Sequence, residues 1–369
     1  MTPLGREIEE IVAAEGPMTV ERFMALALGH PRFGYYTTRD PFGAAGDFTT
    51  APEISQMFGE LLGLWAVEVW SLMGRPSDLR LVELGPGRGT LMADALRAAR
   101  VVPDFVAAAT VHLVETSPVL REVQRAALAE SVDRIVWHEA LADVPPGPAI
   151  VLANEFFDAL PVRQFVRGEG GWHERLVGLG PDGKLAFGVA PRPEPSVEAA
   201  GRPGDLLEMG EVGCALVRDL AGRLGQGGGA ALAVDYGYGS GGPGETLQAV
   251  RRHAFVDPLA EPGEADLTAH VDFAALARAV SGSGATVHGP IGQGDFLRAL
   301  GIEARSKRLR HAADPAKAGE IDAALGRLTG PGPDGMGELF KVVAFSHPSL
   351  AQLPGLPAPM PNPTVADPC

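Results

Sequence analysis

The stretch of sequence that decides the fold is LVELGPGRGT, residues 81–90. Its first four residues predict a short apolar strand, and the glycine-rich turn after them opens a helix at Thr90. Glycine lets the backbone turn tightly and approach a ligand closely. A dinucleotide site has the spacing G-x-G-x-x-G, whereas the glycines here are Gly85, Gly87 and Gly89. The spacing therefore argues against NAD as the ligand.

Short apolar segments alternate with helical segments around this turn. Strands are expected over 80–84, 110–115, 135–137, 149–153, 230–235, 285–288 and 339–345. Helices are expected from Thr90, from Pro118 and over 210–224. This alternation is typical of a parallel sheet that is covered by helices on both faces. We therefore predict an α/β fold.

A separate N-terminal region, residues 1–78, precedes this pattern. The apolar period within 4–30 predicts two short helices joined near residues 16–17, and a further amphipathic stretch runs over 52–73. Between them, residues 34–50 are rich in glycine, hydroxyl groups and aromatic rings. That composition favours a binding loop over a spacer.

Residues 79–346 are predicted to form one domain around the sheet, with three insertions. These cover about 160–205, 236–268 and 290–335. The first is expected to form hairpins, because short strands alternate there with Gly and Pro turns, and the last is expected to be helical. The tail, residues 347–369, is rich in proline, so we expect it to be unfolded.

Composition excludes several classes of protein. With 46% hydrophobic residues the chain can build a substantial core, so disorder throughout is excluded. The 31 basic and 46 acidic residues give a net charge of −15. This balance disfavours nucleic acid as a partner, because phosphate binding needs a concentrated basic surface. A cationic or neutral partner fits better.

The sequence predicts a bacterial cytoplasmic protein without a metal. The bias toward arginine, alanine and glycine resembles that of a GC-rich bacterial genome. Cys214 and Cys369 cannot form a disulfide framework and belong to no zinc-binding pattern. No run reaches the ~18 apolar residues of a membrane span, and Met1–Glu10 is acidic, unlike a signal or transit peptide.

Acidic residues around the glycine turn indicate the chemistry of the ligand. Glu83 precedes the turn by two positions. A carboxylate there favours a ligand with a positive centre, because it would repel a pyrophosphate. Glu115 ends the next expected strand, where a carboxylate can accept both hydroxyls of an adenosine ribose. Glu139 and Ala140 follow the third strand and are placed to border an adenine. These residues predict S-adenosylmethionine, although a glycine turn alone could be a plain strand–helix connection.

A second constellation, NEFFD at residues 154–158, ends the fourth expected strand, at the edge that faces the ligand crevice. Glu155 and Asp158 could clamp a guanidinium bidentately. Arginine stays protonated in water, so carboxylates that orient it and help a proton leave would assist methyl transfer. A capped turn with Phe156 and Phe157 packed inward explains Asp158 equally well, and Glu155 less well.

Four motifs together resemble one family. They are GDFTTAPEISQMFGE at 46–60, ELGPGRGT at 83–90, NEFFDALPV at 154–162 and DLTAHVDF at 266–273. In this order, over about residues 4–346, they look like the MidA family, whose mitochondrial members are the complex I assembly factor 7 proteins. The resemblance implies a class I, seven-stranded, Rossmann-like methyltransferase fold that uses S-adenosylmethionine. It further implies relatives in the mitochondrial matrix that dimethylate an arginine on a core subunit of respiratory complex I.

The candidate site combines the residues of these motifs. His270 could accept a proton or hold a substrate carbonyl, or equally cap the helix that begins near Val271. Tyr236 could stack on the substrate or merely pack, and Asp47 could fix its loop or contact the cofactor. The predicted site is Glu155, Asp158 and His270 for catalysis, Glu83, Gly85, Gly87, Gly89, Glu115, Glu139, Ala140 and Asn154 for the cofactor, and Asp47, Phe156 and Tyr236 for the substrate.

These observations predict an S-adenosylmethionine-dependent methyltransferase that acts on arginine of a protein substrate, with the insertions as the wall that recognises this partner. One alternative is an assembly factor or chaperone that binds a client and keeps the fold as a scaffold, because fold does not determine function. Another is a small-molecule or O-methyltransferase, which would need a closed apolar pocket. A homodimer is compatible with the sequence, although nothing in the sequence requires it.

Overall fold

A central sheet carries the alternating pattern of the sequence. The computed structural model describes residues 2–38, 50–131 and 134–359. Seven strands lie in the order β15-β16-β10-β5-β2-β3-β4, and the short β14 pairs in parallel with the end of β10. The strands are β2 (Leu79–Leu84), β3 (Ala109–Val114), β4 (Ile135–His138), β5 (Ala149–Asn154), β10 (Gly229–Tyr238), β14 (Val271–Asp272), β15 (Thr286–Gly292) and β16 (Phe340–Ser346).

The direction of the strands places the carboxyl ends of β2, β3, β5 and β10 at one edge. Neighbouring strands from β4 to β10 pair in parallel, whereas β16 runs antiparallel to both β10 and β15. The strand order reverses between β2 and β5, where successive chain crossings leave a crevice at the carboxyl edge. Ligands of open α/β sheets bind at this kind of position.

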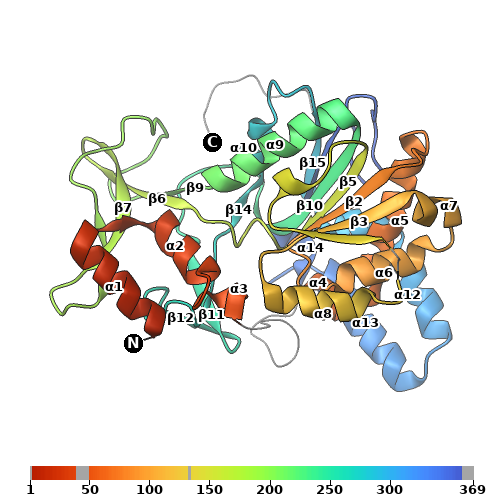
Figure 1. The fold of residues 1–369 in the computed structure, drawn as a ribbon, viewed down its shortest axis with the longest axis horizontal. Coiled ribbons are helices and arrows are strands. Elements are labelled where there is room, and N and C mark those ends of the chain that lie inside the picture. Colours follow the sequence, from red (N-terminus) through yellow and green to blue (C-terminus); the bar gives the residue numbers. More distant parts are fainter. Residues whose placement is uncertain (1, 39–49, 132–133, 360–369) are drawn as a thin grey trace.

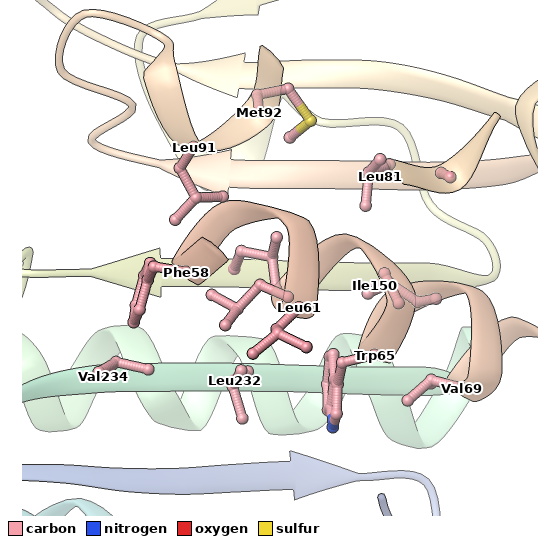
Figure 2. Close-up of a cluster of buried hydrophobic side chains, with 14 of the residues drawn as sticks. Phe58, Leu61, Trp65, Val69, Leu81, Leu91, Met92, Ile150, Leu232 and Val234 are labelled. Carbon is pink, nitrogen blue, oxygen red and sulfur yellow. The ribbon is translucent and has the colours of Figure 1, made fainter. Parts of the chain in front are cut away.

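Helices cover both faces of the sheet because alternate side chains of each strand point to opposite faces. Leu81, Ile150 and Leu232 pack against Phe58, Leu61 and Trp65 of the long helix α5, as Figure 2 shows. Val82, Val151 and Ala231 point the other way and pack under α9 and α10. The helices of this part are α4 (Ala51–Ile54), α5 (Gln56–Leu72), α6 (Thr90–Ala99), α7 (Pro103–Ala108), α8 (Pro118–Leu128), η1 (Leu141–Asp143), α9 (Glu211–Gly227) and α10 (Phe273–Ala279).

The insertion before β16 is helical, as the sequence predicts. It comprises α11 (Gln293–Ala299), α12 (Ile302–His311), α13 (Pro315–Thr329) and α14 (Met336–Leu339). Phe296, Ile302 and Leu328 from these helices join the hydrophobic cluster of α5 and the sheet. The insertion therefore enlarges the main core on the α5 side.

A second lobe combines the chain start with the other insertions, and Figure 1 shows α1, α2, β6 and β7 gathered at one end of the molecule. Leu4, Ile8 and Phe23 from the N-terminal helices share a hydrophobic cluster with Val177 and Leu267. Its elements are α1 (Pro3–Glu15), β1 (Met18–Thr19), α2 (Val20–Gly29), α3 (Tyr35–Thr38), β6 (Arg163–Gly168), β7 (Gly171–Leu179), β8 (Leu185–Val189), β9 (Leu206–Met209), β11 (Gln248–Arg251), β12 (Ala254–Val256) and β13 (Asp266–Thr268).

The two predicted N-terminal helices are present, but the region around them divides between two cores. α1 and α2 pack in the second lobe, where β1 pairs with β7, whereas α5 packs on the central sheet. The expected hairpins of the first insertion form β6, β7 and β8, and β9 extends their sheet. Domain boundaries at residues 78 and 346 stay predictions.

The prediction of an unfolded tail is wrong for residues 350–356. Leu350, Leu353 and Leu356 are buried in the main hydrophobic cluster. The indole Nε1 of Trp65 also donates a hydrogen bond to the carbonyl of Pro354 at 3.2 Å. Leucines spaced among the prolines supply enough apolar surface to hold this segment in place. Residues 360–369 lie outside the described part of the chain.

Candidate functional site

The glycine turn joins β2 to α6 at the carboxyl edge of the sheet. Gly85, Gly87 and Gly89 have φ angles of 60°, 53° and 82°, in the left-handed region that glycine adopts without steric cost. The Gly85 N–H donates to the Val114 carbonyl of β3 at 3.1 Å. A Cβ atom at Gly85 would lie 2.7 Å from Cδ2 of Phe156. The turn is therefore shaped for close approach on the side where the Phe156 ring lies.

Glu83, two residues before the turn, is buried in β2. Its Oε2 atom has no hydrogen-bond partner among the residues that the structure describes. Burial, reinforced by the Glu115 carboxylate, raises the pKa of Glu83 well above its usual range. A cationic ligand group beside this oxygen would supply the missing interaction and favour the ionised carboxylate.

Glu115 follows β3 and is tied to the glycine turn through Gln124 of α8. Its Oε1 accepts from the Ser117 N–H at 2.7 Å, and its Oε2 accepts from Gln124 Nε2 at 3.1 Å. The same Nε2 donates to the Gly87 carbonyl at 2.8 Å. Burial raises the pKa of Glu115, and these donors oppose that shift. Gln124 was missed from the sequence, because no spacing rule marks a glutamine on the following helix.

A narrow cavity of about 40 Å³ lies beside the glycine turn. Glu83, Gly85, Gly87, Asn154 and Glu155 contribute to its lining. The Phe156 ring limits the space here, since it lies directly over Gly85.

Several predicted residues do not line this cavity in the described structure, and Gly89 and Glu115 are among them. Glu139 and Ala140 follow β4 and are exposed, and neither contributes to the cavity lining. The Ala140 N–H instead donates a local hydrogen bond to Asp143 Oδ2 at 3.1 Å. Asp47 lies outside the described residues. Their roles in binding adenine and substrate stay predictions.

Asp235 of β10 holds the turn that follows β5. Its Oδ2 accepts from the backbone N–H groups of residues 156, 157 and 158 at 3.1, 2.9 and 3.2 Å. Its Oδ1 accepts from the Tyr236 N–H at 2.9 Å. Burial and the carboxyl groups of Asp158 and Glu155 raise the pKa of Asp235, whereas the four N–H groups favour its ionised form. The sequence predicts a strand that ends at Asp235, without revealing this structural role.

Glu155 occupies the strained position of this turn, with a φ of 48°. Its Oε1 accepts from the Ala51 N–H at 2.8 Å and from Asn154 Nδ2 at 3.2 Å, while its own N–H donates to the Val234 carbonyl at 2.8 Å. Burial raises the pKa of Glu155 to about 7, and the Asp158 carboxylate adds to that shift against the hydrogen bond from Ala51. The carboxyl group can therefore gain or lose a proton near neutral pH.

A larger cleft of about 580 Å³ opens on the other side of this turn. Asp158, Tyr236 and His270 line it together with Glu155. Asp158 Oδ1 has no hydrogen-bond partner within the described part of the chain, and burial raises the pKa of Asp158 to about 6. The Tyr236 and His270 rings meet edge to face, with centroids 5.2 Å apart. The structure thus brings the predicted catalytic residues into one cleft.

Asp272, and not His270, caps the helix that follows. Asp272 Oδ1 accepts from the Ala275 N–H at 2.9 Å, which is the N-cap bond of α10. The backbone N–H of His270 donates to Thr246 Oγ1 at 2.8 Å, so its imidazole is left facing the cleft. Burial lowers the pKa of His270, which favours the neutral ring at pH 7. The capping explanation for His270 is therefore wrong.

The glycine-turn cavity and the cleft share two lining residues, Thr50 and Glu155. Glu155 therefore stands between the glycine-turn cavity and the cleft. A group held on the glycine turn and a group entering the cleft would approach each other beside its carboxyl group. This adjacency is the central geometric feature of the site.

The segment after Thr50 is fastened to the glycine turn by Glu53. The Thr90 hydroxyl donates to Glu53 Oε1 at 2.5 Å, and Arg88 Nη1 lies 3.9 Å from Glu53 Oε2. These contacts join α4 to the start of α6. They place Ala51, whose N–H serves Glu155, in a defined position.

Several other lining residues of the cleft were missed. Tyr36, Gln248, Asp266 and Arg327 all contribute to it, and the Tyr36 hydroxyl donates to Asp266 Oδ1 at 2.8 Å. They come from segments far apart in the chain, so no local motif unites them. Only the placement of Asp266 in the motif at 266–273 could have drawn attention to it.

Two further findings concern the described residues alone. They contain no group of three or more His, Cys, Asp or Glu side chains arranged to hold a metal ion. They also contain no helix that is both long and apolar enough to cross a membrane.

A glycine turn at the strand-order reversal, an orphan carboxylate before it and a hydrogen-bonded carboxylate after the next strand define an S-adenosylmethionine-dependent methyltransferase of class I. A family described as S-adenosyl-L-methionine-dependent methyltransferase matches residues 61–291, and the chain belongs to this family. The predicted family, fold class and cofactor are thereby confirmed.

Curated relatives extend the similarity over most of the chain. The protein arginine methyltransferase NDUFAF7 of Danio rerio, a mitochondrial protein, is 40% identical over 89% of this chain and 83% of its own length. The proteins of the same name from Mus musculus and Drosophila melanogaster are each 39% identical, over 94% and 93% of this chain and 84% of their own lengths. The similarity therefore includes both lobes.

Solved structures share the whole fold. A superfamily member from Burkholderia thailandensis, crystallised with S-adenosylhomocysteine, is 29% identical and covers 97% of this chain and 95% of its own, with a TM-score of 0.80. A native crystal structure of a protein from the same species and superfamily is 30% identical, with the same coverage and TM-score. The agreement over both chains includes the second lobe as well as the sheet.

Proposed function

We propose that this methyltransferase transfers methyl groups to an arginine of a protein substrate, with Glu155 as the residue between donor and acceptor. The observation that carries the proposal is the position of Glu155 in the lining of both the glycine-turn cavity and the cleft. The names of the curated relatives, protein arginine methyltransferases, support the same substrate class. An acidic cleft suits a guanidinium, whereas a small apolar acceptor would need apolar walls around the reacting group.

The residues around the glycine turn fit S-adenosylmethionine. The orphan Oε2 of Glu83 suits its cationic methionine portion, the glycines allow close approach, and Glu115 offers carboxylate oxygens to the ribose hydroxyls. When bound, this cofactor supplies an electrophilic methyl group on a positively charged sulfur. Asn154 acts through Glu155, because its Nδ2 donates to Glu155 Oε1.

In the cleft, the acceptor guanidinium would lie against Glu155 and Asp158. The unpartnered Oδ1 of Asp158 and the Glu155 carboxylate offer two acceptors for its N–H groups. Such bonds orient one nitrogen toward the donor and draw positive charge toward the other nitrogens. Tyr236 and His270 form an aromatic wall beside them that limits how the guanidinium can turn.

The proton balance assigns a base role to Glu155. The acceptor nitrogen gains a methyl group and gives up one proton, so the product guanidinium carries the same charge as the substrate. A carboxyl group with a pKa of about 7 is ionised often enough at neutral pH to accept that proton and releases it readily afterwards. Asp158, with a pKa of about 6, remains ionised at pH 7 and holds the product charge.

The biological setting belongs to the same proposal. We place the protein in the bacterial cytoplasm and take its substrate to be a respiratory complex I subunit or a comparable assembly partner. Nucleic acid is not expected as a partner, and a homodimer is compatible with the proposal without being required by it.

Cofactor binding is tested first, by calorimetric titration with S-adenosylmethionine, S-adenosylhomocysteine and NAD. The first two should bind and NAD should not. Glu115→Ala should weaken binding of both about tenfold or more, because the ribose hydroxyls lose charged acceptors. Unchanged affinity in this variant would contradict the ribose role of Glu115.

Methyl transfer is tested next, with labelled methyl groups supplied to proteins of a cell extract and hydrolysis to identify the labelled amino acid. The label should appear in methylarginine. Glu155→Gln should lower the rate by about 10²–10⁴-fold while cofactor affinity changes little. Asp219→Asn, an exposed substitution on α9, serves as the matched control. Cofactor binding without any transfer would instead favour the assembly-factor alternative.

A further inference from the structure

Two exposed apolar side chains lie at the rim of the cleft, above a floor that carries carboxyl groups, and Arg327 also contributes to the lining. Phe255 is 77% exposed and Leu339 is 43% exposed, and both contribute to the cleft lining. Large hydrophobic side chains at the edge of a cavity are a feature of binding sites when they lie close together around it. The floor beneath them carries Glu155 and Asp158.

These two apolar residues of the cleft lining come from different lobes. Phe255 lies on β12, in the hairpin that β12 forms with β11, and β11 is anchored by pairing with β13. The turn of this hairpin is tight, with Arg252 and His253 at φ angles of 49° and 60°. Leu339 ends α14, in the helical insertion of the main core. A segment that enters the cleft would therefore touch an apolar side chain from each lobe.

We infer that this rim docks a polypeptide segment in which apolar side chains flank the acceptor arginine on both sides. The inference rests on the proposed function and names the sequence context that the cleft selects. The arginine would reach down to the floor, and its two neighbours would cover Phe255 and Leu339. Burial of the Phe255 and Leu339 side chains contributes binding free energy in addition to that of the guanidinium.

The charges of the cleft indicate which kind of molecule binds there. The buried Oδ1 of Asp158 has no hydrogen-bond partner among the described residues, so the floor calls for a cationic group. The same acidic floor would repel an anionic lipid surface. The cleft volume of about 580 Å³ exceeds what one side chain fills, so neighbouring residues of the partner can enter as well. A cationic side chain on a chain with apolar neighbours satisfies floor and rim together.

The test measures binding of fluorescent synthetic peptides by anisotropy, with S-adenosylhomocysteine present. One peptide carries leucine on both sides of a single arginine, a second carries serine there, and a third has leucine around glutamine. We expect the leucine–arginine peptide to bind about tenfold more tightly than each of the others. Phe255→Ala and Leu339→Ala should each remove most of the leucine preference. Val189→Ala, which alters another exposed apolar residue on β8, is the control and should keep it.

Equal binding of the leucine and serine peptides, or an unaltered preference in Phe255→Ala, would overturn the inference. So would failure of all three peptides to bind. Methyl transfer to the same peptides separates the two proposals. Transfer to the serine peptide as fast as to the leucine peptide would leave arginine methylation standing and reject the docking rim. Tight, rim-dependent binding without transfer would keep the rim and reject the proposed function.

Discussion

Asp235 shows how much of the site depends on a residue that need not touch a substrate. One carboxylate accepts four backbone N–H groups, three of them from the turn that carries Glu155 and Asp158. The strained φ of Glu155 is tolerated because this network over-determines the turn. Its geometry explains why a short motif at the end of β5 can hold two carboxyl groups in fixed positions.

Asp235→Asn should destabilise the protein by about 2–4 kcal/mol, because an amide N–H₂ would face backbone donors that lose their acceptor. The measurement is urea unfolding, with Asp219→Asn as the control that should change stability little. Methyl transfer should also fall, through displacement of Glu155, while cofactor affinity is kept. Wild-type stability in Asp235→Asn would show that the four hydrogen bonds contribute little.

The pH dependence of methyl transfer should report the ionisation of Glu155. Its pKa is raised to about 7, so the fraction ionised increases as pH rises through that value. Because the ionised form accepts the proton, kcat should rise with pH and level off above about 8. A rate that is flat between pH 6 and about 8, with chemistry limiting, would exclude this base.

At the scale of elements, much of the architecture could be predicted from local patterns. The strand–helix alternation and the glycine turn predicted the sheet, because each depends on neighbouring residues. The motif at 154–158 likewise located the turn that carries Glu155 and Asp158. Gln124 could not be found, and Tyr36 and Asp266 could not be assigned to the cleft, since their roles depend on contacts between segments that only the folded chain brings together. The tail prediction failed because proline content was weighed above its three leucines.

The close contact between α5 and α6 can be tested by comparing two glycine substitutions, one inside this contact and one on an open helix surface. A Cβ atom at Gly63 of α5 would lie 2.3 Å from the Ala95 carbonyl oxygen, whereas a Cβ atom at Gly222 of α9 would meet nothing within 4 Å. Gly63→Ala should therefore destabilise by about 1–3 kcal/mol through forced separation of the helices.

Gly222→Ala should stabilise by about 0.4–1 kcal/mol, because alanine reduces the entropy of the unfolded chain. Thermal or urea unfolding of both variants measures the difference. If both substitutions change the free energy of unfolding in the same direction, close packing of α5 on α6 is not the reason that residue 63 is glycine.

At the scale of the whole molecule, the segment after β16 returns to the main core and packs against it. Leu353 is buried against the cluster that contains α5. Leu353→Ala should lower the free energy of unfolding by about 2–5 kcal/mol, since it leaves a cavity in the core. Leu72→Ala, at an exposed position of α5, is the control and should have a small effect. Equal effects of the two would mean that the segment leaves this surface in solution.

The pairing of β1 with β7 has a consequence for synthesis on the ribosome. Met18 pairs with Val177, so the first two helices emerge long before the strand that completes their lobe. Until then, the apolar faces of α1 and α2 have no native partner, while the core of the sheet also awaits β10 and β16. We expect nascent chains to expose these faces and to require protection from aggregation during this interval. The cleft beside Glu155, which both lobes line, would be completed last.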